Sequence, residues 1–466
     1  GECMTTQPTV TGAVVDFIHS LTYDSIPEDV RRELKRCLVD GLGVMLAGTP
    51  SACSRLIQRY VKDSQTPGAS AVVGTNIVTS ASLAALASGV AGHADDFDDT
   101  QLSQTPDRIY GLLTHPTVPA LAAALAVGQD VKANGKEFIT SFCCGFEVEC
   151  KIAEAMNPEH YIKGFHTTGT VGVFGATAAA AKLYKLSPEQ TRFALGIAAS
   201  KSAGLRVNFG TMTKPYHAGA AAENGVVAAR LARLGYQSDP NALDGQWGHF
   251  QVTGGGCDPA RILGHLGNPY TLSWPGVSVK PYPCGSLSHP SMDALLDIIT
   301  ENDIKSSQVA QVRLGAGRNI LNPLRYKEPQ NALEAKFSPQ FCLGILLLRR
   351  RAGLQEFADD VVRLPEVRAM MARVETYHSP EIEAKGSDRM RSLVEVHLKD
   401  GRVLSRLAET SRGTPERPMS RQEMAAKFAD CAHATLSQER IKAALDGIYR
   451  VEEMGSVSEL VKKVTA

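Results

Sequence analysis

Five short stretches combine titratable side chains with glycine or proline, a combination more typical of the loops of a functional site than of a plain core. They are HADDFDDT (93–100), LTHPTVP (113–119), KGFHTTGTVG (163–172), GTMTKPYHAG (210–219) and KPYPCGSLSHP (280–290). Their histidines, lysines and aspartates are residues that exchange protons or bind anions near neutral pH. The stretches therefore indicate acid/base chemistry.

The first stretch places four aspartates within five positions, directly after the alanine-rich run ASLAALASGVAG. Asp95, Asp96, Asp98 and Asp99 cannot all be ionised side by side in a dry pocket without a large cost, so some must face water, pair with cations or share protons. A solvated helix end capped by aspartate explains the stretch as well as a functional site does. A divalent metal site is less favoured, because the central glycine of a calcium loop is missing.

Histidines and a lysine mark the other stretches. His115, His166, His217 and His289 each lie beside proline, threonine, serine or glycine, where a histidine can shuttle protons. Each alone is more often a hydrogen-bonded structural residue, but four in such loops favour a site. Lys214 stands three residues before His217 at the start of an alanine-rich helix, and a lysine at a helix N-terminus is suited to hold a carboxylate or a developing enolate. A surface lysine at a helix start is the alternative.

Signatures of the common cofactor enzymes are missing. The chain has no GxGxxG after a strand, no Walker lysine, no GxSxG elbow and no HExxH helix. The glycine-rich GGGCDPA at 254–260 lacks a strand-to-helix frame and is interpreted as a loop. We therefore expect acid/base work on a small acid, with no cofactor and no metal.

Composition narrows the class of protein. At 466 residues the chain is too long for one hydrophobic core, and its 49 basic and 49 acidic residues include no basic block that would track a nucleic acid. No stretch approaches the ~20 apolar residues that cross a bilayer, and the first residues lack a secretory pattern. Ten cysteines without a CxxC pair indicate reduced thiols. We expect a cytoplasmic protein that binds neither nucleic acid nor membrane.

The periodicity predicts a mainly α protein with two domains. In 28–48, apolar residues recur at helical spacing after a Ser25–Glu28 capping box. Similar runs follow at about 80–94, 117–130, 136–156, 170–184, 187–203 and 217–235. Alternating segments and an Asp-Gly turn then indicate strands, mixed with helical patterns at 288–301 and 331–353. We predict an all-helical domain from 1–271 and 406–466, and a smaller inserted α+β domain at 272–405.

Taken together, DFDDT, THP, GFH, TKPxH and YPCGxxxHP resemble the MmgE/PrpD family over nearly the whole chain. The resemblance implies a large helical domain made from both chain ends, an inserted α+β domain, a homodimer and a metal-free site between the domains, acting on a small di- or tricarboxylate. By motif it implies the catalytic residues Lys214, His217, His166, His115 and Asp96. The implied substrate-binding residues are Thr100 and His289, and Tyr282 of the fifth stretch is a further candidate. Arg206 and Arg325 are candidate carboxylate clamps because arginine offers a planar fork to a carboxylate, and a surface or dimer role is the alternative for each.

The family includes 2-methylcitrate dehydratase, cis-aconitate decarboxylase and iminodisuccinate epimerase. This chain departs from the dehydratase pattern, since it has DFDDT for DFNDT and lacks the RKSW-like and FPAEFHSQ-like stretches. GFHTTGTVGVFGATAAA and NFGTMTKPYHAGAAAENG look closest to iminodisuccinate epimerase. The expectation is an epimerase with Lys214 or His217 on one face of the substrate and His166 or His115 on the other, while Asp96 orients a histidine. A decarboxylase or dehydratase-type lyase is the alternative, and a non-catalytic helical dimer that binds a carboxylate is the non-enzyme alternative.

Overall fold

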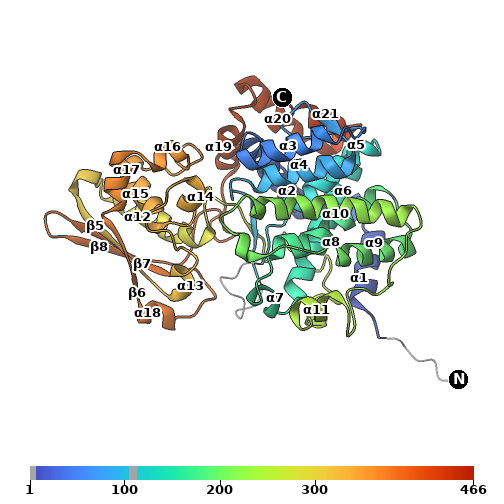
Figure 1. Ribbon diagram of the computed structural model, residues 1–466, viewed down its shortest axis with the longest axis horizontal. Helices are drawn as coiled ribbons and strands as arrows, with labels where there is room; N and C mark the ends of the chain where they lie inside the picture. The colour runs from blue at the N-terminus through green and yellow to red at the C-terminus, as the bar shows by residue number, and fades with distance from the viewer. Residues whose placement is uncertain (1–6, 104–112) are drawn as a thin grey trace.

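The computed structural model describes residues 7–103 and 113–466 and is built mainly from α-helices (Figure 1). The helices that form the larger body before residue 240 are α1 (Val10–Ser20), α2 (Glu28–Gly48), α3 (Ala52–Asp63), α4 (Ala81–His93), α5 (Thr117–Asp130), α6 (Gly135–Ala155), α8 (Thr167–Leu183), α9 (Pro188–Ser200) and α10 (Thr213–Arg233). Each helical run expected from the periodicity is present. The prediction of a mainly α protein is confirmed.

Glycine and alanine let the central helices pack closely. A Cβ atom on Gly89 of α4 would lie only 2.7 Å from the Cα atom of Gly219 in α10, so a larger residue would push these helices apart. Because α4 ends at His93 and α10 begins beside Lys214, this contact fixes how far apart two of the predicted site stretches lie.

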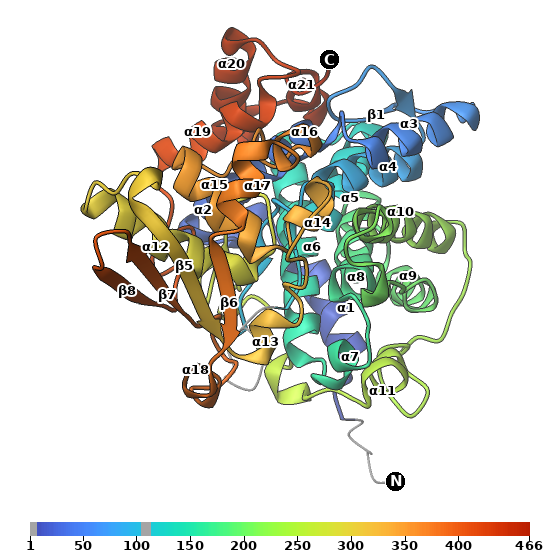
Figure 2. The same ribbon diagram turned by 60° about the vertical axis from the view of Figure 1, so that its left-hand side comes forward.

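A second hydrophobic core packs against a four-stranded sheet, whose strand order is β6-β5-β7-β8. The strands are β5 (Val309–Ala316), β6 (Val374–His378), β7 (Ser392–Leu398) and β8 (Val403–Ala408). β5 pairs with β6 in parallel and with β7 antiparallel, and the β7–β8 hairpin turns at Gly401, whose φ of 92° suits glycine. Helices α12 (His289–Glu301) and α15 (Pro339–Arg349) pack against the sheet, which faces the viewer in Figure 2.

The C-terminal helices return to the first body. They are α19 (Arg421–Ala432), α20 (Gln438–Tyr449) and α21 (Val457–Lys462), and they pack against α2 and α5 (Figure 1). One hydrophobic cluster accordingly joins Val10–Leu272 with Phe428–Val464, and a second runs from Tyr282 to Ala408. The two cores divide near the predicted junctions, with Leu272 and Ala408 just across them, while the division into domains stays a prediction.

Two local predictions are wrong. The capping box before α2 lies between Thr22 and Ser25, not between Ser25 and Glu28, because Pro27 takes the N-cap position. The helical pattern at 331–353 is interrupted after α14 (Ala332–Ala335), since Ser338 caps the new helix that begins at Pro339.

Within the described parts of the chain, no single helix is long and apolar enough to span a bilayer. Helices α2 and α3 reach that length and apolar composition only together, as a pair bent by 84°. The nine cysteines in these parts are all free thiols, as the cysteine spacing predicted.

Candidate active site

Six of the predicted site residues line one cavity of ≈ 180 Å³ between the helical body and the segments around 285 and 324–337. They are Asp96, Thr100, His115, His166, Arg206 and Lys214. Apolar side chains, including Leu113, Leu324 and Phe337, also line it. A small cavity lined by apolar side chains and a few polar groups is typical of a site for a small molecule.

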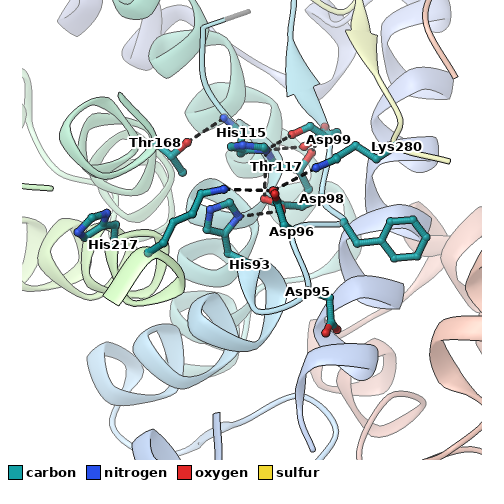
Figure 3. A network of polar contacts seen from close by, with 12 residues as sticks. His93, Asp95, Asp96, Asp98, Asp99, His115, Thr117, Thr168, His217 and Lys280 are labelled. Carbon is teal, nitrogen blue, oxygen red and sulfur yellow. Dashed lines mark hydrogen bonds and ion pairs between the residues drawn. The ribbon is translucent and has the colours of Figure 1, made fainter. Parts of the chain in front are cut away.

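Asp96 is the charged centre of this cavity. It follows α4 in a left-handed conformation with φ of 51°, which turns its carboxylate towards two lysines. Oδ1 of Asp96 lies 3.2 Å from Nζ of Lys214 and 3.1 Å from Nζ of Lys280 (Figure 3). Burial opposes ionisation of Asp96, but the two ammonium groups outweigh it and hold its pKa well below the ordinary value. The site therefore contains a carboxylate that stays ionised and is paired twice.

The other three aspartates each have a different environment (Figure 3). Asp98 is fully buried and its Oδ1 accepts a hydrogen bond of 2.8 Å from Nδ1 of His93. Burial raises the pKa of Asp99 to about 8, and this side chain accepts hydrogen bonds from the hydroxyl and amide of Thr117 at the start of α5. Asp95 points away from Asp96, and burial raises its pKa. The interpretation as a solvated helix end is wrong, because Asp96, Asp98 and Asp99 are buried.

Three of the predicted histidines, His115, His166 and His217, lie close to one another, and each has a lowered pKa. Nδ1 of His115 donates to the carbonyl oxygen of Asp99 at 2.8 Å, so Nε2 of the neutral ring carries no proton. Nδ1 of His166 lies 2.8 Å from Nδ1 of His217, which requires one ring to donate and the other to accept. Burial lowers the pKa of His115 and of His217 to about 4, and burial with neighbouring His93 and Lys214 lowers that of His166.

Arg206 reaches the cavity from the short helical turn before α10. Its guanidinium lies 3.8 Å from the ring centroid of Tyr161 and donates from Nη1 to the Tyr161 carbonyl at 2.9 Å. These contacts fix the plane of the guanidinium, which is the preorganisation that binding of a carboxylate needs. Arg325, the other arginine considered as a clamp, is exposed, bonds to Tyr326 and does not line the cavity.

Three predicted residues lie outside the cavity wall. His217 contacts it only through His166. His289 bonds through Nε2 to the Cys284 carbonyl at 3.1 Å, which closes the turn before α12. Tyr282 is buried, and its hydroxyl donates to Asp293. The structure therefore gives His289 and Tyr282 internal partners and does not place them against a ligand in this cavity. Cys284 is likewise buried among side chains.

Comparison with known proteins identifies the family of this chain. Residues 12–261 match the MmgE/PrpD N-terminal domain, and residues 282–448 match the MmgE/PrpD C-terminal domain. The chain belongs to the MmgE/PrpD family. Cis-aconitate decarboxylases of Mus musculus and Homo sapiens are each 27% identical over 97% of this chain and 93% of their own length. That of Aspergillus terreus is 24% identical over 97% of this chain and 95% of its own length.

These relatives bear on the predicted reaction, which is an epimerase or, as the alternative, a lyase. They are decarboxylases, so they support the lyase alternative over the epimerase. The expected closeness to iminodisuccinate epimerase is not supported by them.

Sequence reasoning missed several residues of this MmgE/PrpD site. Lys280 is the first residue of the fifth stretch, and His93 is the first residue of the first stretch. Their positions in these stretches could therefore have identified both as candidate site residues. Lys336 and Lys427, which bind main-chain oxygens next to Asp96, stand in ordinary helical sequence. Nothing local to these two lysines distinguishes them from surface lysines, so no signal could have found them.

Four of the described side chains, those of His93, Asp96, Asp98 and His115, have potential metal-ligand atoms within 4.8 Å of one another. The charges nearby do not suit a divalent cation, because the Lys214 and Lys280 ammonium groups already contact Asp96 at 3.2 and 3.1 Å. A metal ion at that carboxylate would be repelled by both. Among the residues that the structure describes, this cluster fits an ion-pair network better than a metal site.

Asp96→Asn is expected to lower the free energy of unfolding by about 3 kcal/mol at pH 7, because it leaves two buried ammonium groups without their carboxylate. The pKa of Asp96 is depressed in the folded protein, so the stabilisation is present above the unfolded pKa of about 3.9 and is lost as pH falls below it. Urea denaturation at pH 7, 5 and 3.5 measures this. Asp63→Asn, which breaks the exposed pair with Arg59, is the control. Equal losses in both variants would contradict the argument.

Glu149 of α6 provides a second test of the buried charges. Neither carboxylate oxygen has a hydrogen-bond partner, and burial raises the pKa of Glu149 well above its ordinary value, as does nearby Asp99. Folding therefore takes up a proton here at pH values above the unfolded pKa, and stability present below the unfolded pKa is lost as pH rises.

Glu149→Gln removes this proton uptake. The difference in unfolding free energy between variant and parent should shift in favour of the variant by up to about 1.4 kcal/mol per pH unit as pH rises above the unfolded pKa of about 4.3. Urea denaturation at several pH values measures the difference, with the exposed Glu328→Gln as control. A difference that does not change with pH would contradict the assignment.

Proposed function

We propose that this protein is a cofactor-independent lyase that removes carbon dioxide from a small tricarboxylate of the cis-aconitate type. The observation that carries the proposal is the pairing of Asp96 with both Lys214 and Lys280 in a cavity that apolar side chains also line. The cis-aconitate decarboxylases among its relatives support this substrate class.

The cavity offers different environments to different carboxylates. Lys214, Lys280 and Arg206 are cations in its lining, and Asp96 offsets only one of these charges. A di- or tricarboxylate is therefore attracted to the cavity. Leu113, Leu324 and Phe337 offer no hydrogen bond to a carboxylate, so a carboxylate that lies against them loses water and is destabilised as an anion. Loss of carbon dioxide removes that buried charge.

The reaction follows from the structure of the substrate. In cis-aconitate one carboxylate is attached to a methylene next to the carbon–carbon double bond. When the bond to this carboxylate breaks, carbon dioxide leaves and the electron pair forms a new double bond. The old double bond delivers its pair to the carbon next to another carboxylate, which becomes an enolate. One proton then bonds to that carbon, and one proton is consumed per turnover.

Two groups are placed to assist. The Lys214 ammonium in the cavity lining stabilises the enolate as negative charge develops there. His166 supplies the proton: when Nδ1 of His217 donates to Nδ1 of His166, the neutral His166 ring carries its own proton on Nε2. His217 is thereby a partner of the proton donor and needs no contact with the substrate.

Release of carbon dioxide tests this function. The purified enzyme is incubated separately with cis-aconitate, trans-aconitate and citrate, and carbon dioxide is measured against substrate consumed. We expect one molecule of carbon dioxide per cis-aconitate and none from citrate. Consumption of cis-aconitate without carbon dioxide, or no turnover of any tricarboxylate, would sink the proposal. The homodimer implied by the family is a further proposal, and a monomer mass in light scattering at micromolar concentration would contradict it.

A further inference from the structure

Two buried lysines from distant parts of the chain hold the loop that carries Asp96. Nζ of Lys336, at the end of α14, donates to the Asp95 carbonyl oxygen at 2.7 Å. Nζ of Lys427, in α19, donates to the Phe97 carbonyl oxygen at 2.9 Å and also pairs with Asp40 at 2.6 Å. The main chain is therefore gripped on both sides of Asp96, at the residue before it and the residue after it.

Lys336 also binds the segment that carries Lys280. Its Nζ donates to the Pro283 carbonyl oxygen at 2.8 Å, and its own carbonyl oxygen accepts from the Gly285 amide at 2.9 Å. One side chain thus joins a carbonyl next to Asp96 to a carbonyl three residues after Lys280. Those two segments supply the partners of the Asp96–Lys280 ion pair at 3.1 Å.

Burial of an ammonium group at this position has a free-energy cost. Lys336 is 5% exposed, and no carboxylate lies within ion-pair distance of it among the described residues. The hydrogen bonds of this ammonium go to carbonyl oxygens, and the Phe357 ring centroid lies 5.3 Å from Nζ. A buried lysine with these partners costs more than an apolar side chain of similar length. Asp96 meanwhile keeps φ at 51°, a conformation that persists in a non-glycine residue only when its surroundings enforce it.

We propose that Lys336 is a positioning residue that sets the geometry of the active-site ion pairs by tying the Asp95 and Pro283 carbonyls together. It does not line the cavity and acts only through Asp96 and Lys280. Lys427 holds the same loop from the side of α2 and α19.

Lys336→Met tests this role, since it keeps the length of the side chain and removes the donor. Loss of the tie lets the Asp96 carboxylate separate from Lys280. The groups that face Asp96 are His93 of α4, His115 before α5, Lys214 of α10, Lys280 after the short strand β4 (Val277–Ser278) and Lys336 itself, with Asp98 as the nearby like charge. Loss of the Lys336 charge acts on the pKa of Asp96 in the same direction as the weaker pairing. Weaker pairing with the lysines favours the neutral acid, so the acid limb of the kcat/KM profile moves to higher pH.

We expect kcat/KM to fall by about 10- to 100-fold in Lys336→Met, the range seen when a supporting hydrogen bond behind a reactive group is lost. The exposed Lys327→Met, in the same segment, is the matched control and should leave the profile unchanged. In Lys336→Ala, propylammonium should restore activity while propanol should not, because only the ammonium ion can bind the two carbonyls. A loss of active protein without movement of the acid limb would indicate a packing role and overturn the proposal.

The kinetic readouts rest on the proposed function, so a crystal structure of Lys336→Met supplies one that does not. We expect Asp96 to leave the left-handed region and its contact with Lys280 to lengthen. An unchanged distance of 3.1 Å would overturn the positioning role even if the substrate proved to be different. If Lys336→Met does not fold, Lys336→Gln, which keeps one amide donor, is measured in the same way and should show the same changes in smaller degree.

Discussion

Lys214→Met is expected to lower kcat/KM for decarboxylation by about 10³-fold, the effect of losing a preorganised group that stabilises a developing oxyanion. Lys214 contacts Asp96 at 3.2 Å and lines the cavity, so its ammonium group stands between the fixed carboxylate and the substrate. Methionine keeps most of its length but loses the cation–π contact with Phe209, whose ring centroid is 4.9 Å from Nζ. The loss should fall mainly on kcat, because Lys280 and Arg206 still attract the substrate.

Rates of carbon dioxide release over a range of substrate concentrations measure this effect. Lys163→Met removes an exposed lysine and serves as the control for loss of positive charge. A rise in KM with an unchanged kcat would mean that Lys214 binds ground state and transition state equally. That result would remove it from the role of enolate stabiliser.

His166→Gln is expected to lower kcat by about 10² to 10⁴-fold, because it removes the proton donor and leaves an amide of similar size. KM should change little, since the lysines and Arg206 of the cavity still hold the carboxylates. The 2.8 Å contact between the two Nδ1 atoms makes a further prediction about His217. If His217 acts only through His166, then His217→Gln has little further effect in the His166→Gln background.

Stopped assays of the two single variants and the double variant give the coupling directly. Fully additive losses would show that His217 acts separately from His166. The single His217→Gln variant is informative by itself, because a wild-type rate would mean that the proton on His166 does not depend on its neighbour.

The helices and strands could be predicted because their signals are local. Alternation in β7 and β8 with the Asp400–Gly401 turn identified a hairpin, and β5 and β6 followed from the same period. Only ends and caps failed, as at Pro27 and at the break before Pro339, where one residue decides the local geometry. Pairing between β5 and β6 is set by tertiary packing, which no local pattern reports.

The candidate site could be predicted in part. Six of nine candidate residues line the cavity, because reactive groups in glycine- and proline-containing loops carry a recognisable pattern. His289 and Tyr282 share that pattern, but His289 hydrogen-bonds to the Cys284 carbonyl and Tyr282 to Asp293. Conversely, Lys336 and Lys427 act on carbonyls 241 and 330 positions away, so their roles exist only in the folded chain.

The separate environments of the aspartates explain how so much acid is tolerated after a buried helix. Asp96 is neutralised by two lysines, Asp98 is paired with His93, and burial raises the pKa of Asp99 to about 8. At each position, ion pairs, hydrogen bonds or a raised pKa offset the free-energy cost of burying the carboxyl group. What remains on the cavity side is one ionised carboxylate between cations, which is the feature that the proposed chemistry uses.

Proton NMR in D2O tests the proposed decarboxylation most directly. The enzyme is given cis-aconitate, iminodisuccinate isomers and 2-methylcitrate in separate tubes. The account predicts loss of carbon dioxide from cis-aconitate and entry of one deuteron at the carbon next to a carboxylate, with no change in the other two tubes. Deuterium exchange with interconversion of the iminodisuccinate isomers, or loss of water from 2-methylcitrate, while cis-aconitate stays intact, would contradict it.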